Sequence, residues 1–88
     1  MTRYKLTFTD KETNTSYLLG DNISGYDTAV ITALDYVAAG ASKADENNDQ
    51  AALARLFTVG LTMAEEFASQ KGFDKATSCG FTITRKGY

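Results

Sequence analysis

The residue types that most often carry enzymatic chemistry are sparse in this chain. It contains no histidine and one cysteine, Cys79. Without histidine, neither a Ser-His-Asp nor a Cys-His arrangement can form, and metal sites that use imidazole are excluded. A single cysteine also falls short of a structural zinc site, which usually takes about four Cys or His ligands. We therefore expect no metal site and no bound cofactor.

The acidic residues do not form a converging pair. Glu65 and Glu66 are adjacent in a segment predicted to be helical, so their side chains diverge by about 100°. Asp45, Glu46 and Asp49 lie in a polar stretch that lacks the alternating ligands and central glycine of a calcium-binding loop. Glycosidase-like and metal-assisted chemistry needs acids that converge on one point. The sequence therefore favours solvated carboxylates and a protein that is not an enzyme.

The cysteine is predicted to be buried and unreactive. Cys79 alternates with Phe81 and Ile83 on one side of the last predicted strand. Such a position is typical of a cysteine that packs as a small hydrophobic side chain rather than one that reacts. A lone cysteine also excludes an intramolecular disulfide, which favours a reducing cytoplasm as the setting. No apolar leader and no stretch of membrane-spanning length is found, so no membrane partner is expected.

The charge distribution offers one candidate surface for nucleic acid. The formal net charge of −2 gives no general attraction to phosphate backbones. Four basic residues nevertheless map to the first and last predicted strands: Arg3, Lys5, Arg85 and Lys86. If these strands are neighbours, the four side chains form a basic patch on the open face of the sheet. Sheet-type binders of single strands also stack bases on exposed aromatic residues, whereas Tyr4, Phe8 and Phe81 are predicted to face the core. Nucleic-acid binding is therefore the alternative function and not the leading one.

Several apolar residues lie outside the predicted core-facing positions. Leu18 maps to the open face of the sheet, and the others map to the flanks of the helices: Ile31, Tyr36, Val59 and Met63. Exposed tyrosine and methionine are typical of contact surfaces. The sequence leaves open whether the helices of so small a domain simply have wide apolar stripes. We predict that Tyr36, Val59 and Met63, together with Leu18, bind a partner, and that the first three form a homodimer site if they lie together and stay exposed.

The alternation of apolar and polar residues predicts strands at both ends of the chain. Residues 3–9 alternate, with Tyr4, Leu6 and Phe8 on the core side. A polar run follows at residues 10–15, and a second strand begins at Ser16, which together indicate a β-hairpin. A third strand is expected at residues 79–84.

Two helices are predicted between these strands. Ser24 and Asp27 resemble a capping box at the start of the first helix, and Gly40 is a plausible stop for it. The second helix is expected from about Asp49 to Lys71, after a loop over residues 42–49. Its predicted core-facing stripe is Leu53, Leu56, Phe57, Gly60, Leu61, Ala64, Phe67 and Ala68. We expect both phenylalanines to be buried and Gly60 to let another backbone approach closely.

These elements predict one α+β domain over residues 1–88. Their order is ββααβ, with a three-stranded, mainly antiparallel sheet and two helices packed on one of its faces. By elimination, we expect a small non-catalytic protein-interaction module that binds a protein partner or complex, with a homodimer as one form. A compact, acidic domain without motifs is also the format of phage or mobile-element inhibitors of host or defence complexes, including those of the anti-CRISPR kind.

Overall fold

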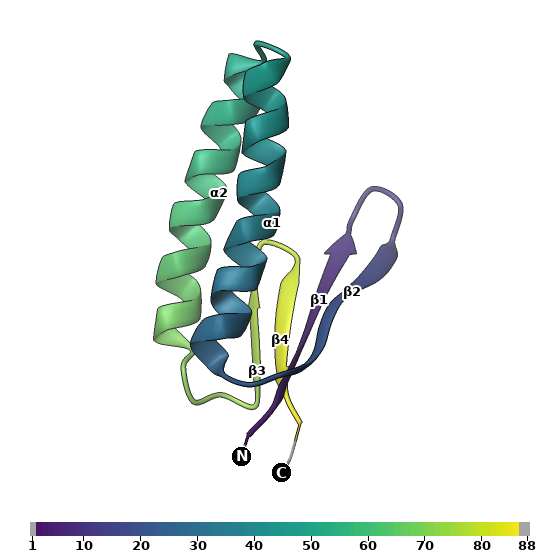
Figure 1. Cartoon of the computed structure of the whole chain (residues 1–88), viewed down its shortest axis with the longest axis vertical. Helices are drawn as coiled ribbons and strands as arrows, with labels where there is room; N and C mark the ends of the chain where they lie inside the picture. The colour runs from purple at the N-terminus through teal and green to yellow at the C-terminus, as the bar shows by residue number, and fades with distance from the viewer. Residues whose placement is uncertain (1, 87–88) are drawn as a thin grey trace.

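The first and last parts of the chain form one sheet, and a long helical hairpin lies across one face of it (Figure 1). The structure is a computed structural model that describes residues 2–86. Its elements are β1 (Tyr4–Asp10), β2 (Thr15–Ile23), α1 (Tyr26–Glu46), α2 (Gln50–Ser69), β3 (Lys75–Ser78) and β4 (Phe81–Arg85). The α+β class and the two helices on one face agree with the prediction. The sheet, however, has four strands and not three.

The strand order is β2-β1-β4-β3, and every neighbouring pair is antiparallel. Strands β1 and β4 therefore occupy the centre of the sheet, so the two ends of the chain run side by side. In their register, Leu6 lies opposite Ile83 and Phe8 lies opposite Phe81. These four side chains share the face that the helices cover, as the alternation predicts.

The strand missed by the prediction is β3, which is only four residues long. It joins β4 through Cys79 and Gly80, which both have positive φ angles, 50° and 88°. Two successive residues with positive φ are typical of a two-residue hairpin turn. The predicted placement of Cys79 in the last strand is therefore wrong, and the residue is exposed at the turn.

The helices also begin and end differently from the prediction. Gly25 caps α1 without a side-chain hydrogen bond, so Ser24 does not form the predicted capping box. Helix α1 continues through Gly40, where a β-carbon would lie 3.6 Å from Leu56 Cδ1 of α2. This glycine is thus part of the contact between the helices and not a stop. The connection is correspondingly short, and the Asp49 side chain caps α2 by accepting a hydrogen bond from the Ala52 amide at 3.0 Å.

The core lies between the sheet and the half of the helical hairpin nearest to it. Its largest fully buried side chains are Leu6, Met63, Phe67 and Ile83. The Tyr26 hydroxyl donates a hydrogen bond to the Phe67 carbonyl, which ties the start of α1 to the end of α2. Burial raises the pKa of this tyrosine above its ordinary value, with a smaller contribution from the charge of Asp27.

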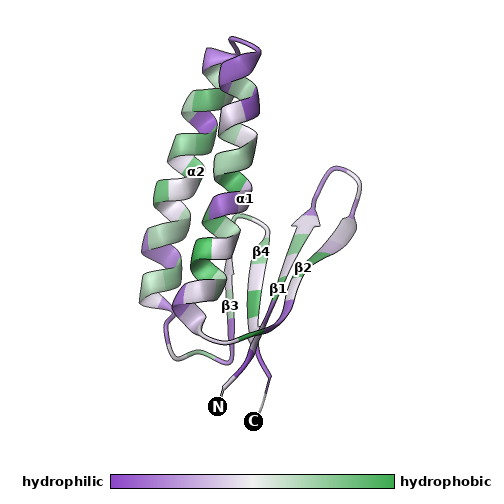
Figure 2. Ribbon diagram, in the orientation of Figure 1, coloured by the Kyte–Doolittle hydropathy of each residue, from purple (hydrophilic) through white to green (hydrophobic). Residues whose placement is uncertain are grey.

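The helical hairpin extends well past the end of β3 and β4 (Figure 1). The longest dimension of the molecule, 45 Å, follows this direction, against 25 and 18 Å for the other two. Apolar residues continue along both helices into the part that the sheet does not reach (Figure 2). Among the described residues, no helix is long and apolar enough to cross a membrane.

Candidate interaction surface

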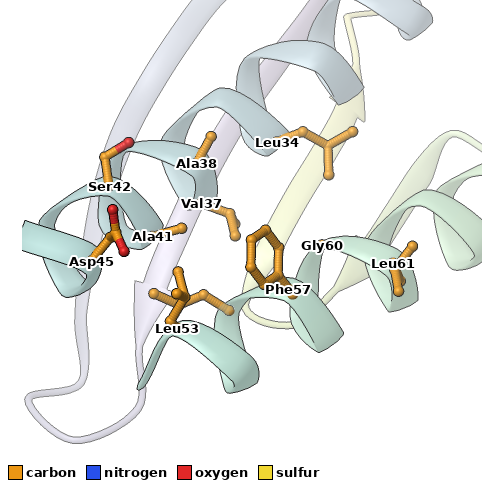
Figure 3. Close-up of a pocket in the computed structure, with 11 residues that line it drawn as sticks. Leu34, Val37, Ala38, Ala41, Ser42, Asp45, Leu53, Phe57, Gly60 and Leu61 are labelled. Atoms are coloured by element: carbon orange, nitrogen blue, oxygen red, sulfur yellow. The ribbon is translucent and has the colours of Figure 1, made fainter. Parts of the chain in front are cut away.

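An open groove of about 750 Å³ runs between the two helices (Figure 3). It is lined mainly by apolar residues from both helices: Leu34, Val37, Ala38, Ala41, Ser42, Asp45, Leu53, Leu56, Phe57, Gly60 and Leu61. Side chains of α1 and α2 point toward one another across it, with the Phe57 ring near its middle (Figure 3). Asp45 and Ser42 are the two polar side chains in this lining, and they lie together on α1 (Figure 3). The groove is therefore an apolar surface with little polar chemistry of its own.

The groove faces away from the sheet. On α1, the Tyr36 ring packs on the sheet residues Phe8 and Phe81, with ring centroids 5.6 and 5.7 Å apart. Ala38, in the groove, lies about 200° around the helix from Tyr36. On α2, Leu61 lies about 160° from the core residue Met63. Nothing within residues 2–86 therefore covers the groove, and we call this side the outer face of the hairpin.

Helix α2 brings a continuous apolar stripe to the outer face. We define this outer stripe as Leu53, Phe57, Gly60, Leu61 and Ala64, which fall within about 100° of arc on the helix. The Phe57 side chain is 63% exposed and that of Leu61 is 70% exposed. The prediction that Phe57 is buried is therefore wrong, whereas the prediction for Phe67 is confirmed.

Phe57 is exposed because of the way α2 is rotated on the sheet. The helix is apolar over more than half of its circumference, and the face that packs on the sheet contains Met63 and Phe67, with Val59 at its edge. Phe57 lies about 120° from Met63 around the helix. The N-terminal part of α2 extends past the end of β3 and β4 (Figure 1), and the side-chain hydrogen bonds between the helix and β3 lie at its other end, at Glu66 and Gln70.

Gly60 in the outer stripe does not serve the predicted close approach within the chain. A β-carbon at this position would meet no described atom within 4 Å beyond its chain neighbours and the adjacent helix backbone. Glycine inside a helix costs about 1 kcal/mol relative to alanine. No contact of the monomer offsets this cost, and the missing side chain leaves a notch in the outer stripe.

The four residues predicted to bind a partner do not form one surface. Met63 is fully buried in the core, so its predicted position on an exposed flank is wrong. Val59 is partly buried and packs against the core. Tyr36 is 47% exposed, but its ring packs on two phenylalanines of the sheet. Leu18 is 60% exposed, and lies opposite Thr7 on the face of the sheet that carries no helix. The triad that would have formed the predicted homodimer site is therefore not an exposed patch.

The predicted basic patch is divided between the two faces of the sheet. Strands β1 and β4 are neighbours, as the hypothesis required. However, Arg85 lies opposite Tyr4, and therefore on the helix side, where it bonds to the Gly72 carbonyl and lies 3.5 Å from Asp74. The open face instead carries Arg3, Lys5 and Lys86, which alternate with Tyr4 and Arg85 along the two strands.

One of the basic residues on the open face is already engaged with an acid. The Lys86 ammonium donates a hydrogen bond to Asp21 at 2.8 Å. This hydrogen bond lowers the pKa of the Asp21 carboxyl below its ordinary value. The pairing reduces the positive charge that the open face presents to a phosphate backbone.

The remaining groups with chemical potential lie apart from the groove. The Ser78 hydroxyl donates to Glu66 Oε1, which joins β3 to α2 next to the exposed Cys79. Over residues 2–86, no three Asp, Glu or Cys side chains lie close enough together to hold a metal ion. Buried hydrogen-bonding atoms without a partner are also absent from the described side chains. The arrangement favours contact by apolar packing.

The outer stripe is the feature that sequence reasoning missed. Its signal was present, because α2 has more apolar residues than one core-facing stripe of a short domain requires.

No known protein family, curated protein or solved structure matches this chain.

Proposed function

We propose that this chain is a non-catalytic protein-interaction module that binds a protein partner through the outer face of its helical hairpin. The observation that carries the proposal is the uncovered apolar groove between α1 and α2, with Phe57 and Leu61 largely exposed beside it. Exposed apolar surface of this kind, gathered over two elements, marks sites of interaction.

The energetics favour an apolar partner surface. Full burial of a phenylalanine or leucine side chain contributes roughly 1.5–3 kcal/mol. Phe57 and Leu61 retain most of this gain for a binding event, because each is more than half exposed. Asp45 is the one charged residue in the groove lining, so a partner needs little polar complementarity there. A helix with an apolar face is the form of partner that such a groove accommodates.

Binding without catalysis also fits the role of an inhibitor. A short domain that covers a functional surface of a larger complex needs only a docking face and a rigid scaffold. We include in the proposal that the chain, alone or as a homodimer, acts as a phage or mobile-element inhibitor of a host or defence complex in the anti-CRISPR manner.

The proposal is tested by partner capture with matched surface variants. The tagged chain and two variants, Phe57→Glu and Leu18→Glu, are expressed in the organism that carries the chain, and co-purifying proteins are identified. Both substituted residues are more than half exposed, so both variants should fold, which circular dichroism would check. We expect one protein to co-purify with the wild type and with Leu18→Glu, and to be lost with Phe57→Glu. Equal capture by all three would refute a docking role of the groove.

A further inference from the structure

We propose that the partner of the outer face is a second copy of this chain, packed so that the two α2 helices run antiparallel about a two-fold axis. The inference rests on the proposed function, because it names the partner of the same surface. Three features of the outer face support it: the order of large and small residues in the outer stripe, the position of the charges at the two ends of the hairpin, and the available area.

The outer stripe is complementary to itself when two copies run antiparallel. Two of its large residues, Leu53 and Phe57, come first along α2, and its small residues Gly60 and Ala64 follow on either side of Leu61. About a two-fold axis between residues 58 and 59, position 57 faces position 60 of the other copy, and position 53 faces position 64. Leu53 and Phe57 then each meet a small residue, as in well-packed interfaces, and Leu61 faces Leu56. In a parallel pair, Phe57 would instead meet Phe57, and Gly60 would meet Gly60.

The same arrangement explains the notch at Gly60. Apart from its chain neighbours and the adjacent helix backbone, no described atom lies within 4 Å of the position that a β-carbon would occupy there. In the antiparallel pair, the Phe57 ring of the second copy enters this space, and the Phe57 ring of the first copy enters the equivalent notch. Because the axis relates the two contacts, one complementary pair of residues is used twice.

The charges of the hairpin favour the antiparallel over the parallel pair. The turn between the helices is acidic, with Asp45, Glu46 and Asp49. At the other end, Lys71 lies 3.4 Å from Asp27, and both side chains are largely exposed. Antiparallel packing places the Lys71–Asp27 ion pair of one copy beside the acidic turn of the other, whereas parallel packing would bring the two acidic turns together.

The outer face is large enough for a weak dimer. Helix α2 has 20 residues, so it is about 30 Å long, and two adjacent helices are about 20 Å wide. Such a face covers about 600 Å² per copy, or about 1,200 Å² in total, which is at the lower end of specific protein interfaces. We therefore expect dissociation in the micromolar range.

Sedimentation equilibrium across roughly 1–100 µM protein, a range suited to an interface of this size, tests the association. We expect reversible dimer formation by the wild type. Phe57→Glu and Gly60→Leu should each weaken it by at least about tenfold, the first by burying a charge and the second by filling the notch. Leu18→Glu and Ala39→Leu are the controls, because both residues are exposed and neither lines the groove. They should leave the dimer unchanged.

Cysteine cross-linking tests the direction of the helices. In a Cys79→Ser background, Leu53→Cys and Ala64→Cys variants should form a disulfide with each other when mixed and oxidised, and far less when each is alone. Efficient cross-linking of either variant alone would refute the antiparallel arrangement.

The two proposals fail in different ways. A wild-type chain that stays monomeric up to the highest concentration refutes the second copy. If Phe57→Glu still abolishes capture of another protein, the proposed docking function is retained for that protein. A dimer that is insensitive to both Phe57→Glu and Gly60→Leu refutes self-association through the outer stripe.

Discussion

The two halves of the helical hairpin are built from similar residues but have different surroundings. In the half nearest the sheet, Met63 and Phe67 of α2 are fully buried together with Ala29 and Ala33 of α1. In the half beyond the sheet, Ala44 is the buried residue of α1, and it lies outside the core cluster that packs on the sheet. Phe57, one of the two phenylalanines of α2, therefore remains exposed.

The difference separates the part of α2 that stabilises the fold from the part to which we assign the proposed binding. Burial of apolar surface stabilises the fold only where a second layer covers it. The sheet supplies that layer for the C-terminal half of α2. Its C-cap residue Gln70 donates a hydrogen bond to the Thr77 carbonyl and accepts one from the Thr77 amide, and Ser78 donates one to Glu66. The N-terminal half keeps apolar surface exposed, and this is the surface of the proposed binding.

The largest expected effect separates the two phenylalanines of α2. Phe67→Ala should reduce the free energy of unfolding by about 3–5 kcal/mol, because it leaves a cavity in the core. Phe57→Ala should reduce it by less than about 1 kcal/mol, because that side chain is mostly exposed in the monomer. Urea unfolding of both variants, in protein dilute enough to be monomeric, measures the difference.

Similar losses in the two variants would contradict the comparison. They would mean that the half of the hairpin beyond the sheet is packed as tightly as the half on it. The Phe57→Ala measurement should also be repeated at high protein concentration. If the outer face self-associates, the loss of unfolding free energy caused by Phe57→Ala will be larger there than in dilute protein.

A smaller effect is expected from the hydrogen bond that closes the end of the hairpin nearest the sheet. Tyr26→Phe removes the bond to the Phe67 carbonyl and should cost about 1 kcal/mol, because that carbonyl also accepts a hydrogen bond from the Gln70 amide. The effect should depend on pH. The folded pKa of Tyr26 is raised, so its stabilising contribution is complete below the unfolded pKa of about 10 and is lost as the pH rises toward the folded pKa.

Urea midpoints between about pH 8 and 11 measure this dependence, with Tyr36→Phe as the control. The wild type and Tyr36→Phe should lose stability above about pH 10 more steeply than Tyr26→Phe does. Parallel pH profiles for all three proteins would show that Tyr26 is not buried in the way the structure describes.

The sequence predicted the elements whose pattern is set locally. Alternation at Tyr4, Leu6 and Phe8 predicted β1 and its buried side, and the apolar spacing around Phe67 predicted α2. The stop at Gly40 was wrong because tertiary contact with Leu56 lets the helix continue through a residue of low helix propensity. Strand β3 was missed because four residues carry too short a pattern, and its pairing with β4 depends on the turn conformation at Cys79 and Gly80.

The candidate site was harder to predict than the fold. Periodicity shows that α2 is apolar but does not fix its rotation on the sheet. The sequence therefore predicted that Met63 is exposed and Phe57 buried, whereas in the structure Met63 is buried and Phe57 exposed. The length of the sheet relative to the helices also decides which residues are covered. That length depends on where β3 and β4 turn, which is a property of the whole fold and not of α2.

The smallest effect is expected on the other uncovered surface, the open face of the sheet. If the outer face of the hairpin is the binding surface, the wild type should give no gel shift with single- or double-stranded nucleic acid, even at low salt, where phosphate binding is strongest. The physical reason is the division of the basic residues, since Arg85 lies on the helix side and Lys86 is paired with Asp21. Asp21→Asn sharpens the test, because it removes the carboxylate from the open face while Arg3, Lys5 and Lys86 remain. A salt-sensitive shift that strengthens in this variant and weakens in Lys5→Glu would favour the nucleic-acid alternative, and would transfer the function from the helices to the sheet. The absence of a shift in all three proteins would leave the outer face of the hairpin as the candidate binding surface.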